Sequence, residues 1–198
     1  MTSLTFKTCT GSEMLPYLDD LAALRIAVFR EFPYLYDGDL AYEKRYLATF
    51  AEADKAVLVL AFDGVNIVGA STGMPLDKET ENIQKPFLDR DIPVETVYYF
   101  SESVLHPSYR GLGAGVHFMT ERERWALGLG SFLWLAFCGV VRPGDHPRRP
   151  DDYLPLDSFW MNRGFQKALG MTCTINWQDL DEESESPKIL QFWMKPLF

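Results

Sequence analysis

The stretch Val104-Leu105-His106-Pro107-Ser108-Tyr109-Arg110-Gly111-Leu112-Gly113-Ala114-Gly115 leads from an apolar segment into a basic, glycine-rich loop that opens a helix. Three of the five residues at 111–115 are glycines, so few Cβ atoms keep a ligand away from the backbone there. The N–H groups of the loop and of the first helical turn can then point at one spot, and Arg110 adds a permanent positive charge. This arrangement predicts a binding site for phosphate groups.

Spacing within this loop excludes two familiar phosphate-binding motifs. A Walker loop ends in Gly-Lys-Ser or Gly-Lys-Thr, whereas this loop ends in Gly115-Val116-His117. The dinucleotide motif G-x-G-x-x-G requires a third glycine at position 116 or 118, where the chain has Val116 and Phe118. The loop is therefore expected to hold its phosphate ligand in a different way.

Composition indicates a globular protein. The chain has 198 residues, of which 47% are hydrophobic and 14% aromatic, enough for a single domain over residues 1–198 with a substantial core. No apolar run reaches the roughly 20 residues of a membrane span, and residues 1–7 lack the basic and apolar parts of a secretion signal. We therefore expect a cytoplasmic protein that does not act at membranes.

Charge and cysteine content narrow the range of partners. The net charge of −9 and the pI of about 4.8 disfavour binding to nucleic acid and favour cationic partners. Cys9, Cys138 and Cys173 are odd in number, widely spaced and not accompanied by histidines at the spacing of metal ligands. They predict neither a disulfide framework nor a metal site.

Hydrophobic periodicity predicts strands and helices in a defined order. Asp63-Gly64 is a strong signal for a tight hairpin turn between two strands, and Ser12 and Asp39 can cap helices. The predicted elements are a strand at 4–10, helices at 12–29 and 39–53, strands at 56–62 and 67–73, a short helix and loop within 77–93, a strand at 96–105, a helix at 113–127, a strand at 132–141, a short helix at 156–163, and strands at 171–177 and 189–194.

Two motifs and this element order resemble one known family. Arg110, Gly113 and Gly115 fit the pattern Arg/Gln-x-x-Gly-x-Gly/Ala. Phe159-Trp160-Met161-Asn162-Arg163-Gly164-Phe165 is similar to a Phe-Tyr-x-x-x-Gly-Phe signature on a final helix. Together with the order of elements along nearly the full chain, these motifs resemble the GCN5-related N-acetyltransferase (GNAT) superfamily.

The resemblance implies both a fold and an activity. The expected fold is α+β (α/β three-layer), the GNAT acyl-CoA N-acyltransferase fold. It has a mixed, mostly antiparallel sheet of about seven strands, splayed between the fourth and fifth strands and flanked by helices. The implied activity is acetyl-CoA-dependent N-acetyl transfer, direct and without a metal, to the primary amine of a small molecule, amino acid or peptide.

The resemblance also implies where the donor binds. In this family the pantetheine arm lies between the two splayed strands, so the backbone of Val104 and Leu105 is expected to bond to it. The pyrophosphate is expected to bind along Arg110, Gly111, Leu112, Gly113, Ala114 and Gly115. Because the backbone does much of this binding, a bulky residue in place of one of these glycines should impair it most.

Acetyl transfer needs a base for the amine and an acid for the departing thiolate. Family members commonly place a carboxylate on the fourth strand, which makes Glu102 the expected base, acting directly or through water. The family's usual tyrosine acid is replaced by Trp160, so Tyr153 is the expected proton donor, with Tyr109 or water as alternatives. The two histidines near the loop are expected to contact CoA or solvent rather than to transfer protons: His106 and His117.

Two loops are expected to surround the acceptor. Residues 31–37 offer aromatic and acidic side chains, which suit a cation or an aromatic amine. Residues 142–153 offer arginines, which suit a carboxylate, so an amino acid or small peptide would satisfy both loops. The candidate substrate contacts are Glu31, Tyr34, Tyr36 and Arg142.

Two other functions stay open. A CoA-binding or regulatory module that has lost catalysis would explain the missing tyrosine, and an acyltransferase with another acyl donor would use the same loop. A homodimer is also possible, because Phe192-Trp193 near the C-terminus looks exposed in the sequence.

Overall fold

A tight turn organises the middle of the sheet. Asp63-Gly64-Val65-Asn66 joins β2 (Val57–Asp63) to β3 (Asn66–Pro75), and Gly64 has a φ of +60° that other residues rarely adopt. The two strands pair antiparallel from this turn to Val57 opposite Gly73. The predicted hairpin is confirmed, and most of its residues are buried.

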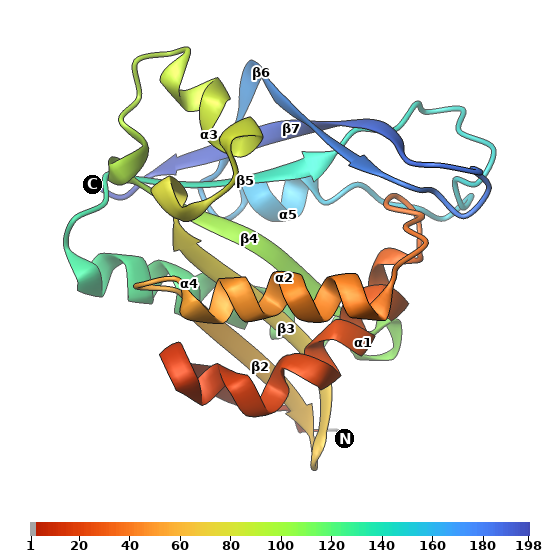
Figure 1. The fold of residues 1–198 in the computed structure, drawn as a ribbon, viewed down its shortest axis with the longest axis horizontal. Helices are drawn as coiled ribbons and strands as arrows, with labels where there is room; N and C mark the ends of the chain where they lie inside the picture. The colour runs from red at the N-terminus through yellow and green to blue at the C-terminus, as the bar shows by residue number, and fades with distance from the viewer. Residues whose placement is uncertain (1–2) are drawn as a thin grey trace.

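The computed structural model describes residues 3–198 and contains a seven-stranded sheet with helices on both faces (Figure 1). The strand order is β1-β2-β3-β4-β5-β7-β6. β4 and β5 run parallel and the other neighbours antiparallel, which confirms the expected mixed sheet. The other strands are β1 (Thr5–Cys9), β4 (Val97–Leu105), β5 (Trp134–Val140), β6 (Gln166–Trp177) and β7 (Ser186–Pro196).

Helices form the two outer layers. α1 (Leu18–Phe29) and α2 (Leu40–Glu52) cross one face of β2, β3 and β4, and α4 (Ala114–Leu129) packs on the opposite face (Figure 1). α3 (Glu81–Leu88) and α5 (Asp157–Met161) cover the half of the sheet that contains β7. Short 3₁₀ helices are η1 (Gly11–Tyr17), η2 (Leu76–Lys78), η3 (Val94–Thr96) and η4 (Pro107–Tyr109). Over residues 3–198, no helix combines the length and the apolarity that crossing a membrane requires.

The first helical segment differs from its prediction. Ser12 was expected to cap one continuous helix, but the cap is Thr10, whose backbone N–H donates to the Glu13 carboxylate at 3.2 Å. The segment is η1 until Tyr17, and α1 begins only at Leu18. Pro16 explains the delay, because proline has no N–H for the α-helical ladder and disfavours helical geometry in the preceding residue. Asp39, in contrast, caps α2 as predicted, with its carboxylate 2.7 Å from the backbone nitrogen of Tyr42.

The last two strands are longer than predicted. β6 extends back to Gln166 because a register shift lies between Lys167 and Thr172, a stretch whose Gly170 has a φ of +70°. This irregularity conceals the strand pattern in the sequence. β7 lies between β5 and β6, so Phe192 and Trp193 are buried, and their expected exposure is wrong.

β4 and β5 separate halfway along their length. Parallel pairing runs from Val97 opposite Trp134 to Tyr99 opposite Ala136, and no further pair joins these strands within the described chain. β5 continues along β7 as far as Val140. The expected splay between the fourth and fifth strands is therefore confirmed, and beyond Tyr99 the edge of β4 that faces β5 is open.

β4 also contains one extra residue where it pairs with β3. Met74 lies opposite Tyr99 and Thr72 opposite Glu102, so two steps along β3 match three along β4. A bulge of this kind changes the face to which later side chains point. Phe100 packs in the core beside α4, whereas Glu102 reaches α1 on the other face.

A buried arginine lies behind this bulge. Arg122 of α4 is 1% exposed and donates to the carbonyl oxygens of Thr72 and Glu102, both at 3.0 Å, and to Ser103 Oγ at 2.8 Å. Its guanidinium also lies 4.2 Å from the ring centre of Phe100. Burial lowers the pKa of Arg122 to about 9, so the side chain remains cationic at neutral pH. Arg122 thus supplies donors to oxygens at the point where the ladder is irregular.

Candidate functional site

The glycine-rich loop has the backbone geometry that its sequence requires. Gly111 and Gly113 have φ values of +78° and +88°, and Gly113 is the N-cap of α4. A Cβ atom at Gly115 would lie 3.2 Å from the ring of Phe159, so this position is also restricted. The first N–H groups of a helix have no partner within the helix, and the helix dipole is positive at this end. The loop can therefore receive an anion at the start of α4.

Arg110 extends from this loop toward the segment between α1 and α2. Its Nη2 lies 2.7 Å from the Glu31 carboxylate, and both side chains are substantially exposed. The predicted phosphate-binding arginine and one predicted substrate-binding residue are therefore in contact. An exposed pair of this kind contributes only about 0–1 kcal/mol, so a phosphate group could displace the glutamate from Arg110.

Val104 and Leu105 lie at the end of β4 and connect the splay to the loop. They pair with Ala70 and Gly69 on β3, while the opposite edge of β4 has no strand partner at this point within residues 3–198. Extended backbone with a free edge can bond to an extended ligand in the manner of an added strand. Loop and open edge thus form one continuous surface along β4 and the start of α4.

Glu102 lies within a buried cluster of charges. Arg25 of α1 contacts the carboxylates of both Glu43 and Glu102. The Glu43 side chain is fully buried and that of Glu102 is 7% exposed. One carboxylate oxygen of each glutamate and the hydroxyl of Thr72 have no hydrogen-bond partner within the described chain. The cluster contains two carboxylates and one guanidinium, so its formal charge is −1.

Arg25 and Glu43 were not among the predicted site residues, although the sequence contains a signal for both. Arg25 follows Ala22 by three positions and precedes Phe29 by four, so it lies in the apolar stripe of α1. Glu43 precedes buried Leu47 by four positions on α2 in the same way. A charge within an apolar stripe indicates a buried partner.

A second carboxylate near the splay was also missed. Glu79 follows η2, and its carboxylate accepts a hydrogen bond from Ser101 Oγ at 3.1 Å and one from the Thr80 N–H at 3.4 Å. Burial raises the pKa of Glu79, while the hydrogen bonds from Ser101 and Thr80 act to lower it. Because Glu79 stands in the polar stretch Asp77-Lys78-Glu79-Thr80, its sequence context gives no sign of burial.

Two predicted substrate residues lie close to these charges. The ring of Tyr34 packs against Phe29 and Trp177, with centroid distances of 4.6 and 6.0 Å. Burial raises the pKa of Tyr34 well above its ordinary value, so its hydroxyl stays protonated. Tyr36 has a raised pKa for the same reason and because the Glu43 carboxylate lies near it. Both tyrosines therefore lie near the cluster of Arg25, Glu43 and Glu102.

Arg142 has a different environment from the one expected for a ligand contact. It donates to both carboxylate oxygens of Asp179, at 2.7 and 2.9 Å, and to the carbonyl oxygens of Pro33 and Tyr34, both at 2.7 Å. Its side chain is 9% exposed. Four hydrogen bonds within the protein occupy this guanidinium, so we assign it to holding the α1–α2 segment rather than a substrate carboxylate.

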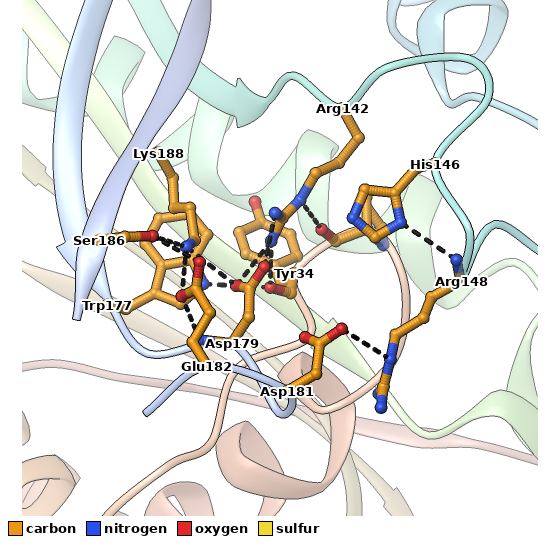
Figure 2. A network of polar contacts seen from close by, with 11 residues as sticks. Tyr34, Arg142, His146, Arg148, Trp177, Asp179, Asp181, Glu182, Ser186 and Lys188 are labelled. Carbon is orange, nitrogen blue, oxygen red and sulfur yellow. Dashed lines mark hydrogen bonds and ion pairs between the residues drawn. The ribbon is translucent and has the colours of Figure 1, made fainter. Parts of the chain in front are cut away.

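Asp179 connects Arg142 to a wider polar network. Figure 2 shows Arg142 and Lys188 on two sides of Asp179, with Glu182 and Ser186 completing the contacts of the lysine. Lys188 Nζ lies 2.7 Å from the Glu182 carboxylate and is buried. The network joins the connection between β6 and β7 to the segment between α1 and α2.

The two tyrosines and two histidines considered for proton transfer each contact another residue of the protein. Tyr153 packs edge-on against Phe32 at 4.7 Å, and burial raises its pKa, so it remains protonated at neutral pH. Tyr109 donates to the Asp63 carboxylate at 2.8 Å, which occupies its proton. His117 stacks on Phe6 with a centroid distance of 3.8 Å. His106 accepts a hydrogen bond from the backbone N–H of Ser108 at 3.4 Å.

No group of three or more His, Cys, Asp or Glu side chains is arranged to hold a metal ion within residues 3–198.

Solved structures are similar to this chain over almost its full length. An N-acetyltransferase from Staphylococcus aureus Mu50 is 11% identical, with 99% of each chain covered and a TM-score of 0.63. A ribosomal-protein-alanine N-acetyltransferase from Brucella melitensis is 14% identical, with 97% of this chain and 99% of the other covered and a TM-score of 0.62. An acetyltransferase of the GNAT family from Streptococcus pneumoniae is 13% identical, with 98% and 99% covered and a TM-score of 0.59.

Similarity at the level of sequence is much weaker. No protein-family model matches the chain, and no curated protein sequence matches it. Identities of 11–14% establish the architecture and leave substrates undefined. The chain therefore has the fold of the GNAT-family acetyltransferases.

Proposed function

We propose that the protein is an acetyl-CoA-dependent N-acetyltransferase that transfers the acetyl group directly to a primary amine. The observation that carries this proposal is the position of the splay relative to the loop. β4 stops pairing with β5 after Tyr99 and runs on toward the glycine loop that begins α4. A thioester on an extended arm and a pyrophosphate at its other end fit such an elongated surface.

The donor is held mainly by backbone groups in this proposal. The open edge of β4 at Val104 and Leu105 bonds to the pantetheine arm, and the loop from Arg110 to Gly115 binds the pyrophosphate. Arg110 exchanges its exposed contact with Glu31 for the phosphate. The N-terminal end of α4 adds a favourable field for the same negative charge.

The acceptor is proposed to be a cationic primary amine on a small molecule, an amino acid or a peptide. The cluster formed by Arg25, Glu43 and Glu102 has a formal charge of −1, which an ammonium group could balance. Tyr34 and Tyr36 add aromatic surface beside it, and Glu31 lies at the outer end of the same segment.

The reaction requires removal of protons from the amine and protonation of the thiolate. Two carboxylates are candidates for the base: Glu102, which the sequence indicated, and Glu79, which bonds to the preceding residue Ser101. Tyr153 is the proposed proton donor, because its phenol O–H is protonated at neutral pH and lies in the loop expected to surround the acceptor. Water is the alternative donor.

Calorimetry with acetyl-CoA tests donor binding, and release of free CoA thiol with a set of amines tests transfer. The amines are phenethylamine, spermidine, lysine and glycylglycine. Binding with turnover of at least one amine supports the proposal, whereas a protein that does not bind acetyl-CoA contradicts it.

Trp160 in place of the family's usual tyrosine favours one other function, a CoA-binding regulatory module. Acetyl-CoA binding without turnover of any amine would support that function. Turnover with a longer acyl-CoA but not with acetyl-CoA would instead identify a different acyl donor.

A further inference from the structure

Glu79 lies at the splay although it belongs to neither of the separated strands. It follows β3 and η2, yet its carboxylate bonds to Ser101 of β4 at 3.1 Å. Ser101 comes two residues after Tyr99, the last residue of β4 that pairs with β5. The carboxylate is therefore placed where the two parallel strands come apart.

Titratable groups from several elements surround this carboxylate. The negative charge of Glu79 acts to raise the pKa of one side chain in each of α2, β4, β5 and β6: Tyr46, Tyr99, Cys138 and Cys173. The Tyr99 hydroxyl lies 3.0 Å from Cys138 Sγ, so these groups converge across the separated strands. Next to Glu79 in the chain, Asp77 and Lys78 pair with each other.

Glu79 and Glu102 differ in how their charge is balanced. Glu102 is in an ion pair with Arg25, which also binds Glu43. Glu79 takes part in no ion pair within the described chain, and its two hydrogen-bond donors are neutral: the Ser101 hydroxyl and the Thr80 amide. Glu79 is therefore the carboxylate at the splay whose negative charge has no cationic partner among residues 3–198. A half-buried carboxylate in this condition attracts a cation or a proton.

We propose that Glu79 is the catalytic base of the acetyl transfer and that Glu102, fixed by Arg25, is a positioning residue. The assignment rests on the proposed function. The acceptor ammonium gives one proton to Glu79, and the nitrogen lone pair then forms the N–C bond with the thioester carbonyl carbon. The C–S bond breaks, Tyr153 protonates the departing thiolate and takes the remaining surplus N–H proton in exchange, and Glu79 releases its proton to solvent.

The first test replaces Glu79 with glutamine, with Glu81→Gln as the matched control. Glu81 is exposed on α3, two residues away, and undergoes the same chemical change. For an amine that the wild type acetylates, Glu79→Gln is expected to lower kcat/KM about 100-fold or more. Its affinity for acetyl-CoA should stay within about twofold of wild type because the pyrophosphate loop is unchanged, and Glu81→Gln should match wild type in both measurements.

The second test uses Ser101→Ala, which keeps the base but removes one of its donors. The Ser101 hydrogen bond lowers the pKa of Glu79, so its loss should move the acidic inflection of the rate profile to higher pH. A base at Glu102 would leave that inflection unmoved. An unshifted inflection, or a Glu79→Gln variant with more than about a tenth of wild-type kcat/KM, overturns the assignment.

The outcomes separate this assignment from the proposed function. A wild-type protein that fails to bind acetyl-CoA contradicts the proposed function itself, whereas an active wild type with an equally active Glu79→Gln variant contradicts only the assignment of the base. If none of the four amines reacts, the hydrolysis of acetyl-CoA, with water as acceptor, is measured instead. Equal hydrolysis rates in wild type and Glu79→Gln, or no hydrolysis in either, also overturn the assignment of Glu79 as the base.

Discussion

Replacing Arg122 with methionine tests how the bulge in β4 is held. Methionine keeps a long unbranched side chain beside Phe100 but removes every donor of the guanidinium. The carbonyl oxygens of Thr72 and Glu102 and the hydroxyl of Ser103 then each lose a hydrogen bond. The bond to the Thr72 carbonyl is buried, so water cannot readily replace its lost donor, whereas the bonds to Glu102 and Ser103 are partly buried.

The expected loss of stability follows from opposing contributions. A hydrogen bond to a charged group contributes about 1.5–3 kcal/mol, and Arg122 makes three such bonds to the β3 and β4 region. Burying a charge costs several kcal/mol, and methionine avoids that cost. We therefore expect the Arg122→Met variant to lose about 3 kcal/mol in the free energy of unfolding, which is large for one substitution.

Urea unfolding followed by tryptophan fluorescence measures this difference. Arg124→Met is the matched control, because Arg124 lies on the same helix with a side chain that is 71% exposed. Its stability should stay within about 0.5 kcal/mol of wild type. A loss below about 1 kcal/mol for Arg122→Met would mean that the oxygens at the bulge do not depend on this arginine, and would refute the reasoning.

Three further predictions concern the loop, the polar network and the proton donor. Gly113→Ala places a side chain at a φ of +88° and should lose about 1–2 kcal/mol of stability and weaken acetyl-CoA binding in calorimetry. Gly128→Ala, at an uncrowded position in the same helix, should instead gain up to about 1 kcal/mol, and similar effects of the two would contradict the argument. Hydrogen bonds from Lys188, Ser186 and the Asp179 N–H lower the pKa of Glu182 from 4.5 to about 2, so its contribution to stability is complete above pH 4.5 and is lost as the pH falls toward 2. Glu182→Gln should therefore flatten the stability profile between pH 4.5 and 2 in urea titrations, and an unchanged slope would count against this explanation. Tyr153→Phe should lower kcat about tenfold or more with unchanged acetyl-CoA affinity, and an unaltered kcat would make water the proton donor.

The parts of the fold that the sequence predicts depend on residues close together in the chain. Asp63-Gly64 makes a hairpin because Gly64 accepts a positive φ, and Asp39 begins α2 because its carboxylate bonds to a backbone N–H three residues on. The glycine loop was predictable for the same reason, because Gly111 and Gly113 both adopt positive φ values that glycine allows. In each case a local rule of backbone geometry is enough.

The bulge in β4 shows why the site was harder to predict. Simple alternation along the strand places Phe100 and Glu102 on the same face, under α4. The extra residue reverses this relation, so Glu102 points to Arg25 on the other face. The bulge forms in the pairing with β3, and Arg122 donates to its carbonyl oxygens. Both features arise from the assembled sheet and are absent from the local sequence.

Arg142 and Arg110 show how an arginine that can bind a ligand differs from one that holds the fold. The difference lies in how many hydrogen bonds the protein itself already makes to the guanidinium. Arg142 and Arg110 both stand in polar loops, and the sequence made both candidates for binding anions. The fold gives Arg142 four acceptors and buries it, while it leaves Arg110 exposed with one glutamate that a phosphate could replace. The same criterion, applied to carboxylates, favours Glu79 over Glu102 as the proton acceptor, because a group is available for chemistry when the protein has not already satisfied its charge.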